Sequence, residues 1–182
     1  RRHGNTETNS VAALPCLVAF FRAMKAIAGD LLQLALDGRF DVIVHGCNCM
    51  CQMGKGIAKS IKKQFPEPFE ADQQTVAGDR AKLGTITTAD VTRGERRFTV
   101  VNAYTQYDYR PPGPNVDYDA VRSAMRQIKG RFGGKRIGYP KIGAGLAGGD
   151  WNRIAAIIDE ELAGEDHTLV EFTETKQGAI RG

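Results

Sequence analysis

The chain has 182 residues, of which 42% are hydrophobic and 25% charged, a composition typical of one soluble domain with a single core. No apolar run approaches the roughly 18 residues that a membrane-spanning helix needs, because the longest, residues 11–21, is interrupted by Pro15. The formal net charge of +4 is too small to predict a surface that coats nucleic acid. The 21 glycines exceed the roughly 13 expected at an average near 7%, which indicates that backbone groups do much of the binding.

The predicted domain covers residues 24–173. Residues 1–23 mimic a signal peptide, with arginines before an apolar stretch, but no A-x-A cleavage pattern follows. Because Met24 precedes the first predicted strand, we expect residues 1–23 to be an extension outside the domain. Residues 174–182 are expected to form a polar, frayed tail.

The first half of the domain begins with a short strand over residues 25–28. A helical turn over 31–36 and a buried, β-branched strand over 41–45 that ends at Gly46 come next. Apolar residues then recur at helical spacing over 56–65, which predicts an amphipathic helix. A second short helix is expected over residues 68–75.

The second half opens with strands over residues 82–88 and 97–104. Asp117 then offers an N-cap for a helix, followed by a strand over 136–139, and Asp150 can cap a further helix. The expected inner faces of these helices comprise Ala120, Val121, Ala124, Met125 and Ile128 in one, and Trp151, Ile154, Ile157, Ile158 and Leu162 in the other. With a closing strand over 168–172, this order predicts an α/β fold whose mostly parallel sheet is covered on both faces, with ligands over the carboxyl ends of the strands.

Four cysteines, Cys16, Cys47, Cys49 and Cys51, do not resemble a secreted disulfide framework, because three of them alternate along one segment and are poorly placed to bridge one another. With His45 they form H-x-C-x-C-x-C, but zinc sites usually combine C-x2-4-C pairs that lie far apart. The sequence therefore predicts no metal site and reduced thiols, which favours a cytoplasmic location.

Three loops follow predicted strand ends. Gly29 and Asp30 end the first strand, residues 46–61 (GCNCMCQMGKGIAKSI) lead into a helix, and residues 140–151 (PKIGAGLAGGDW) lead into another. Glycines before a helix N-terminus let amide groups approach an anion. No G-x-G-x-x-G opens the first strand-to-helix turn, and G-x-x-x-x-G-K-[ST] is absent, so the pattern predicts a phosphate and sugar ligand without a standard nucleotide motif.

Together these segments resemble a macrodomain, the ADP-ribose-binding fold. The resemblance rests on IAGD at residues 27–30, VIVHGCNCMCQMGKGIA at 42–58 and YPKIGAGLAGGDW at 139–151. It covers residues 24 to about 172 and implies a three-layer α/β/α fold with a mixed, mostly parallel sheet. Within the family, H-x-C-N-C followed by M-G-x-G-I-A is similar to the branch that holds ADP-ribose-1''-phosphate phosphatases, single-domain deacylating macrodomains and DNA-ADP-ribose glycohydrolases.

The resemblance implies that Asp30 accepts a hydrogen bond from the adenine amino group, although an N-cap for the helix after it is the alternative. Two loops are implied to hold the distal ribose and the diphosphate, and the alternative is a pair of tight turns. Their residues are Gly54, Lys55, Gly56, Ile57, Ala58, Gly143, Ala144, Gly145, Leu146, Ala147 and Gly148. No cofactor is implied.

Two residues are candidates for catalysis. Asn48 corresponds to a polar residue that faces the distal ribose, and His45 matches a histidine proposed for catalysis in the phosphatase. An imidazole that titrates near neutrality can act as acid or base at a phosphoryl group. For His45, a satisfied core residue is an equally weighted alternative, and Asn48 can instead be an Asn tolerated in a left-handed turn.

The chain departs from the branch at two positions. Gln106 stands where glycohydrolases of the antitoxin type carry a lysine, and Ala147 replaces an acidic residue of the deacylating enzymes. Glutamine neither donates a proton like an acid nor forms a Schiff base. The sequence thus favours a hydrolase acting at the distal ribose by phosphate removal or by cleavage of an ADP-ribosyl link. A non-catalytic ADP-ribose-binding module and a nucleotide-binding domain for another ligand such as RNA are the alternatives; the expected partner is ADP-ribose or an ADP-ribosylated substrate, with nucleic acid only if ADP-ribosylated and no membrane.

Overall fold

The structure, a computed structural model, describes residues 24–173. The expected extension (1–23) and tail (174–182) lie outside the described residues. The strands are β1 (Lys25–Gly29), β2 (Val42–Asn48), β3 (Ile86–Arg93), β4 (Arg96–Gln106), β5 (Arg136–Tyr139) and β6 (Asp166–Phe172). The helices are α1 (Leu31–Leu36), α2 (Gly56–Gln64), α3 (Glu67–Gln73), the 3-10 turn η1 (Arg80–Lys82), α4 (Tyr118–Phe132) and α5 (Trp151–Glu161).

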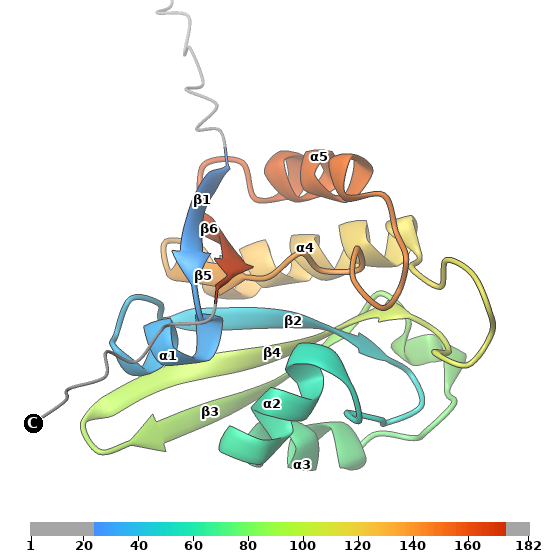
Figure 1. The fold of residues 1–182 in the computed structure, drawn as a ribbon, viewed down its shortest axis with the longest axis horizontal. Coiled ribbons are helices and arrows are strands. Elements are labelled where there is room, and N and C mark those ends of the chain that lie inside the picture. Colours follow the sequence, from blue (N-terminus) through green and yellow to red (C-terminus); the bar gives the residue numbers. More distant parts are fainter. Residues whose placement is uncertain (1–23, 174–182) are drawn as a thin grey trace, which may run out of the picture.

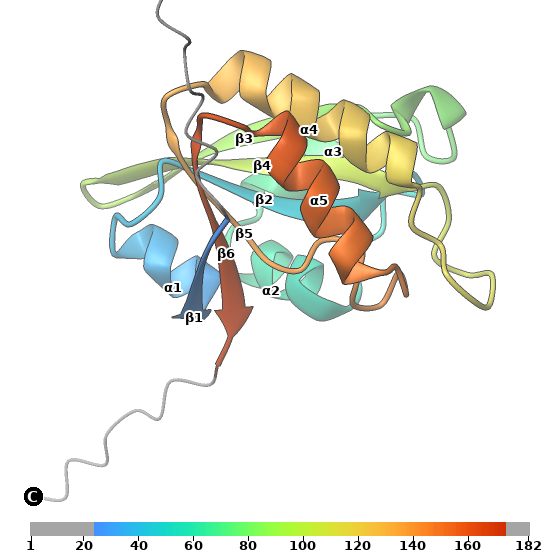
Figure 2. The same ribbon diagram turned by 90° about the horizontal axis from the view of Figure 1, so that it is seen from above.

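The six strands form one mixed sheet in the order β1-β6-β5-β2-β4-β3. All neighbours are parallel except the β3–β4 hairpin at one edge. Helices α4 and α5 cover one face, and α1, α2 and α3 lie on the other (Figures 1 and 2). The expected three-layer α/β/α architecture is confirmed.

Each face of the sheet has its own apolar core. One joins the inner stripes of α4 and α5 to Val42 and Val44 of β2, and the other joins α1 and α2 to Ile43. Alternate residues of β2 therefore enter opposite cores, as a strand buried on both faces requires. The caps expected at Asp117 and Asp150 are confirmed, because their carboxylates accept hydrogen bonds from Ala120 N and Asn152 N at 2.9 Å.

Two predicted boundaries differ most from those in the structure. Strand β2 continues through Gly46 to Asn48, because a residue without a side chain fits against Thr105, whose Oγ1 would lie 2.9 Å from an added Cβ. Strand β3 begins at Ile86 rather than at Lys82, which belongs to η1. Asp79 caps that turn by accepting a hydrogen bond from Ala81 N at 2.8 Å.

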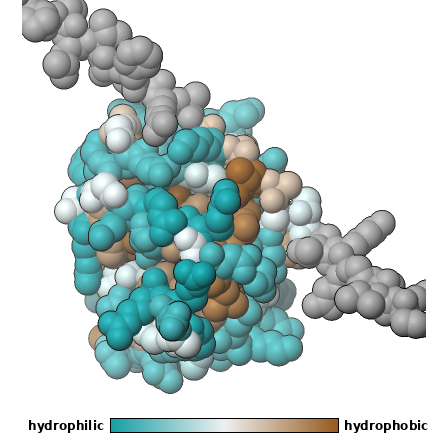
Figure 3. All heavy atoms as spheres, turned by 90° about the vertical axis from the view of Figure 1, so that its left-hand side faces the viewer, coloured by the Kyte–Doolittle hydropathy of each residue, from teal (hydrophilic) through white to brown (hydrophobic). Residues whose placement is uncertain are grey.

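On the side of the molecule that carries α1 and the β3–β4 turn, hydrophilic residues cover most of the surface and hydrophobic ones show between them in patches (Figure 3). This surface agrees with a sheet whose apolar side chains are enclosed by helices. Within residues 24–173, no helix has the length and apolar character needed to cross a membrane.

Candidate active site

A cleft of about 470 Å³ lies over the carboxyl ends of β2, β4 and β5. The loops after β2 and β5 form its two walls, and both come from strands that end at the same edge of the sheet (Figure 1). This is the position at which open α/β sheets bind ligands. The residues that line it are Gly46, Cys47, Asn48, Gln52, Gly54, Lys55, Gly56, Ile57, Ala58, Thr105, Gln106, Tyr109, Pro140, Lys141, Ile142, Gly143, Gly145, Leu146 and Ala147.

The wall after β5 presents free backbone donors. Within residues 24–173, the amides of Gly145, Leu146 and Ala147 donate no hydrogen bond, although Gly145 and Gly148 pair across the loop, with Gly148 N donating to Gly145 O at 3.0 Å. Three adjacent unpaired amides at a cleft form a concavity suited to an anion. The loop therefore offers more than a tight turn.

The wall after β2 ends at the N-terminus of α2. Lys55 is the N-cap and its side chain makes no capping hydrogen bond, so the first amides of the helix, on Gly56, Ile57 and Ala58, have no acceptor within the described residues. Unpaired amides and the helix dipole attract negative charge, worth about 0.3–1 kcal/mol. Both walls of the cleft thus favour an anionic ligand.

Asn48 lies in the cleft, but its side chain also holds its own loop. Its Nδ2 donates to Gln52 O at 2.8 Å, and its Oδ1 accepts from Met50 N at 3.0 Å. One amide hydrogen of Asn48 remains for a ligand. Gln52 lines the cleft beside it, so both can orient ribose hydroxyls.

His45 is not brought into the cleft. Its side chain is fully buried, and Nε2 lies 2.7 Å from Asn102 Oδ1. Burial lowers the pKa of His45 to about 4, despite the hydrogen bond to Asn102, so the ring is neutral at physiological pH. The geometry supports the core-residue alternative, and direct proton transfer from His45 to a cleft ligand has no support in it.

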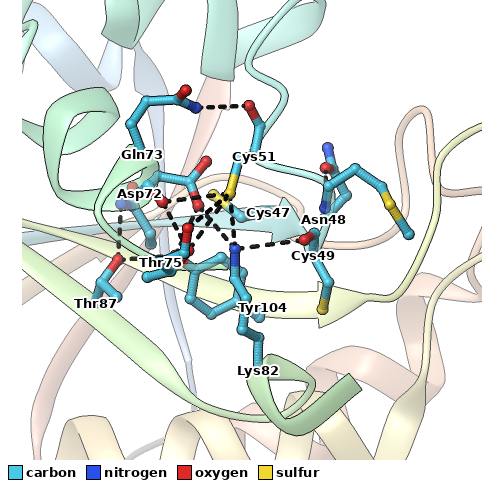
Figure 4. Close-up of polar contacts among 12 residues, drawn as sticks. Cys47, Asn48, Cys49, Cys51, Asp72, Gln73, Thr75, Lys82, Thr87 and Tyr104 are labelled. Carbon is cyan, nitrogen blue, oxygen red and sulfur yellow. Dashed lines mark hydrogen bonds and ion pairs between the residues drawn. The ribbon is translucent and has the colours of Figure 1, made fainter. Parts of the chain in front are cut away.

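Below the cleft floor lies a buried polar network (Figure 4). Cys47, which lines the cleft, has its Sγ 3.6 Å from both ring nitrogens of His45. Burial raises the pKa of Cys47 far above its ordinary value, which makes this thiol a poor nucleophile. Cys47, Cys49 and Cys51 are free thiols. Within the described part of the chain, no group of three His, Cys, Asp or Glu side chains is arranged to hold a metal.

Asp30 lies outside the cleft lining, beside the end of β1. Its Oδ1 accepts hydrogen bonds from Leu32 N at 2.8 Å and Gln33 N at 3.3 Å, which caps α1. Phe172 pairs in register with Gly29 at the same strand ends, and its side chain is 73% exposed. Phe172 thus pairs with the residue that precedes Asp30, and an exposed aromatic ring at this strand end suits a nucleobase. Sequence reasoning did not single out Phe172.

The structure brings most of the expected loop residues together, but Ala144 and Gly148 do not line the cleft. Gly148 has a positive φ of 67° and shapes the turn instead. Sequence reasoning missed Gln52, Thr105 and Tyr109 as lining residues; a signal was available for Thr105 and Tyr109, since both lie at or just after the end of β4.

Among residues 24–173, the only charged side chains that line the cleft are those of Lys55 and Lys141. Lys141 forms an ion pair with Glu171 at 2.7 Å, whereas Lys55 has no ion-pair partner within the described residues. An unpaired ammonium beside unpaired amides adds to the attraction for a phosphate.

The comparisons with known proteins agree with this geometry. The Macro domain family model matches residues 44–158. An uncharacterized 17.5 kDa protein of Enterobacteria phage T4 is 37% identical over 155 residues, covering 82% of this chain and 96% of that protein. A DNA ADP-ribosyl glycohydrolase of Mycobacterium tuberculosis is 25% identical over 127 residues, or 70% of this chain and 35% of that protein.

An ADP-ribose 1''-phosphate phosphatase of Lodderomyces elongisporus is 23% identical over 146 residues, covering 75% of this chain and 91% of that protein. Among solved structures, the macrodomain of Mycobacterium tuberculosis DarG superimposes with a TM-score of 0.65 at 20% identity, covering 84% of this chain and 98% of that chain. The family match spans more than half of the chain and includes the two cleft loops. This chain belongs to the Macro domain family.

Proposed function

We propose that the cleft binds ADP-ribose and that the chain hydrolyses an ADP-ribose derivative at the distal ribose. The observation that carries this proposal is the pair of unpaired amide runs, Gly56–Ala58 and Gly145–Ala147, that face one cleft. They are arranged to hold a diphosphate from both sides. The family match and the named relatives support the same ligand.

The sheet order gives the ligand a direction. Strands β1 and β6 lie at one side of β5 and β2, and β4 lies at the other. Adenine would lie near Asp30 and Phe172, the diphosphate between the two glycine loops, and the distal ribose over the ends of β2 and β4. Asn48, Gln52 and Gln106 would then surround the distal ribose.

For the reaction itself, we infer that phosphate or an ester is removed from the distal ribose more readily than an ADP-ribosyl group is removed from DNA. Gln106 lies at the cleft where the resemblance places a lysine in the DNA-deribosylating enzymes, and an amide has no proton to give near neutral pH. Lys55 can stabilise negative charge on a leaving phosphate. Asn48 would orient the hydroxyls, while the catalytic role expected of His45 stays a prediction.

A second candidate, a non-catalytic ADP-ribose-binding module, is favoured by a different observation. Among the described residues, the cleft lining contains no carboxylate and no histidine. Hydrolysis usually depends on a positioned acid or base, worth about 10²–10⁴ in rate. A cleft that binds through amides alone would hold ADP-ribose without turnover.

A three-substrate assay separates these readings. The chain is incubated under matched conditions with ADP-ribose-1''-phosphate, a protein carrying a terminal ADP-ribose ester, and ADP-ribosylated DNA. We expect release of phosphate, or of ADP-ribose from the ester, to be faster than deribosylation of the DNA. Faster deribosylation of the DNA contradicts the proposed preference, and binding of ADP-ribose with no turnover of any substrate establishes the binding-module reading.

A further inference from the structure

The loop between β2 and α2 has two faces. Asn48 and Gln52 line the cleft, whereas the side chains of Cys49 and Cys51 point into the protein and are 0% and 5% exposed. The position of the buried face therefore determines where the cleft face lies. Any group that holds Cys49 and Cys51 in position therefore also fixes the positions of Asn48 and Gln52.

The buried ammonium group of Lys82 contacts this buried face of the loop directly (Figure 4). The Nζ atom of Lys82 donates to Cys51 Sγ at 3.1 Å, to Asp72 Oδ1 at 3.2 Å and to Cys49 O at 3.4 Å. Lys82 is 6% exposed and Asp72 is 1% exposed. Burial by itself would lower the pKa of Lys82, but its contacts with Cys51 and Asp72 raise it, so the ammonium stays charged.

The same loop segment is held in a demanding conformation. Cys51 has a φ of 55° and, among residues 24–173, it is the one non-glycine residue with a positive φ. Its carbonyl accepts from Gln73 Nε2 at 2.9 Å, and Cys49 O also accepts from Gly78 N at 2.8 Å. A left-handed residue without a glycine persists where its surroundings impose it.

The network also reaches the cleft floor. Asp72 Oδ1 accepts from Tyr104 OH at 2.8 Å, and contacts of 2.7–3.1 Å then run through Thr87 and Asn102 to His45, which touches Cys47 of the cleft lining. Lys82 thus connects, through side chains alone, to both the loop wall and the floor of the cleft.

A stabilising role alone does not account for this arrangement. Replacing a buried ion pair by well-packed apolar groups of similar volume is often neutral for folding or stabilising, and here Asp72 Oδ2 is buried with no hydrogen-bond partner among residues 24–173, a further cost. Charge is therefore retained at a place where the fold gains little from it. What the charge does supply is two directed contacts, to Cys49 O and Cys51 Sγ, onto the segment between the cleft residues Asn48 and Gln52.

We propose that Lys82 is a positioning residue: by donating hydrogen bonds to Cys49 O and Cys51 Sγ from the buried side of the loop, it fixes the cleft wall at Asn48 and Gln52. Lys82 does not touch the ligand. Its effect on affinity rests on the proposed ADP-ribose binding, whereas its effect on the loop does not.

The test uses a charge-free pair and a sulfur deletion. The double variant Lys82→Met/Asp72→Asn removes both charges together. Cys51→Ala removes the contacts of the sulfur with Lys82 Nζ, Asp72 O and Thr75 while leaving the ion pair. The matched control is Asp41→Asn/Arg136→Met, which removes an ion pair of 2.6 Å at the amino ends of β2 and β5. Each protein is measured by calorimetric titration with ADP-ribose and by hydrogen exchange of the amides of Met50 and Gln52.

We expect both test variants to weaken ADP-ribose binding at least tenfold and to speed exchange at Met50 and Gln52, with the control unchanged in both. Parent-like affinity and exchange in a folded test variant would overturn the proposal. If the double variant does not fold, Cys51→Ala decides alone. If the parent protein does not bind ADP-ribose, the proposed function fails, and the exchange rates still decide whether Lys82 positions the loop.

Discussion

A substitution at Gly145 can distinguish a ligand-binding loop from a turn that is only structural. An added Cβ at Gly145 would meet no heavy atom of residues 24–173 within 4 Å, and the φ of Gly145 is not in the left-handed region. The folded protein can therefore accept Gly145→Val with a change in stability of about 0.5 kcal/mol or less. In contrast, Gly143 has a φ of 71° and a Cβ there would lie 2.6 Å from Val116 Cγ2, so Gly143→Val should destabilise the fold.

Gly145→Val is expected to weaken ligand binding instead. The open space around Gly145 belongs to the cleft, and a branched side chain there keeps a phosphate from the amides of Gly145 and Leu146. Hydrogen bonds to charged groups contribute about 1.5–3 kcal/mol each. Loss of two at the lower value is about 3 kcal/mol, which is more than 100-fold in Kd.

The assay is calorimetric titration of ADP-ribose into parent and variant, with thermal melts alongside. The control is Gly130→Val on the exposed side of α4, where an added Cβ also meets no atom of the described part of the chain within 4 Å. We expect the control to bind like the parent. A folded Gly145→Val protein with parental affinity would refute the assignment of this loop to the diphosphate.

Three further outcomes are expected. Asp30→Ser keeps an N-cap for α1 but removes the carboxylate from the ligand, so ADP-ribose affinity should fall by about 1.5–3 kcal/mol with little change in melting temperature; parental affinity would leave Asp30 as a cap alone. Phe172→Ala removes a side chain that is 73% exposed, so stability should hold while affinity falls by about 1–3 kcal/mol, the value of a stacked base, and an unchanged Kd would exclude stacking. Folding lowers the pKa of His45 from 6.5 to about 4, so between these pH values the unfolded chain binds one more proton than the folded one. The contribution of neutral, buried His45 to the free energy of unfolding is therefore fully present above pH 6.5 and falls by up to about 3 kcal/mol as pH drops towards 4. In denaturant titrations His45→Gln should flatten this pH dependence, and an identical slope would contradict the burial argument.

Sequence patterns predicted the elements whose local signals agree with their surroundings. Asp117 and Asp150 are followed by helical apolar spacing, and both cap helices as expected. The start of β3 was misplaced because Lys82 precedes a β-branched segment, yet its long side chain turns inward to Asp72. That contact joins parts of the chain that no local pattern connects.

The anion-binding role of the glycine loops could be proposed from the sequence because it depends on consecutive residues. The buried position of His45 could not be predicted. Alternation along β2 puts its side chain on the same face of the sheet as Ile43, but the sequence does not show which face α3 covers. Asn102 donates to Pro68 O at 2.8 Å and so ties His45 beneath α3. Phe172 was missed because its meaning depends on pairing with Gly29 in the first strand.

The most direct test of the central claim is a calorimetric titration of the parent protein with ADP-ribose, with ADP and ribose 5-phosphate as partial ligands. The two amide runs and the Asp30–Phe172 end predict saturable binding of one ADP-ribose per chain, tighter than either partial ligand. Absence of saturable binding at millimolar ADP-ribose would contradict the account.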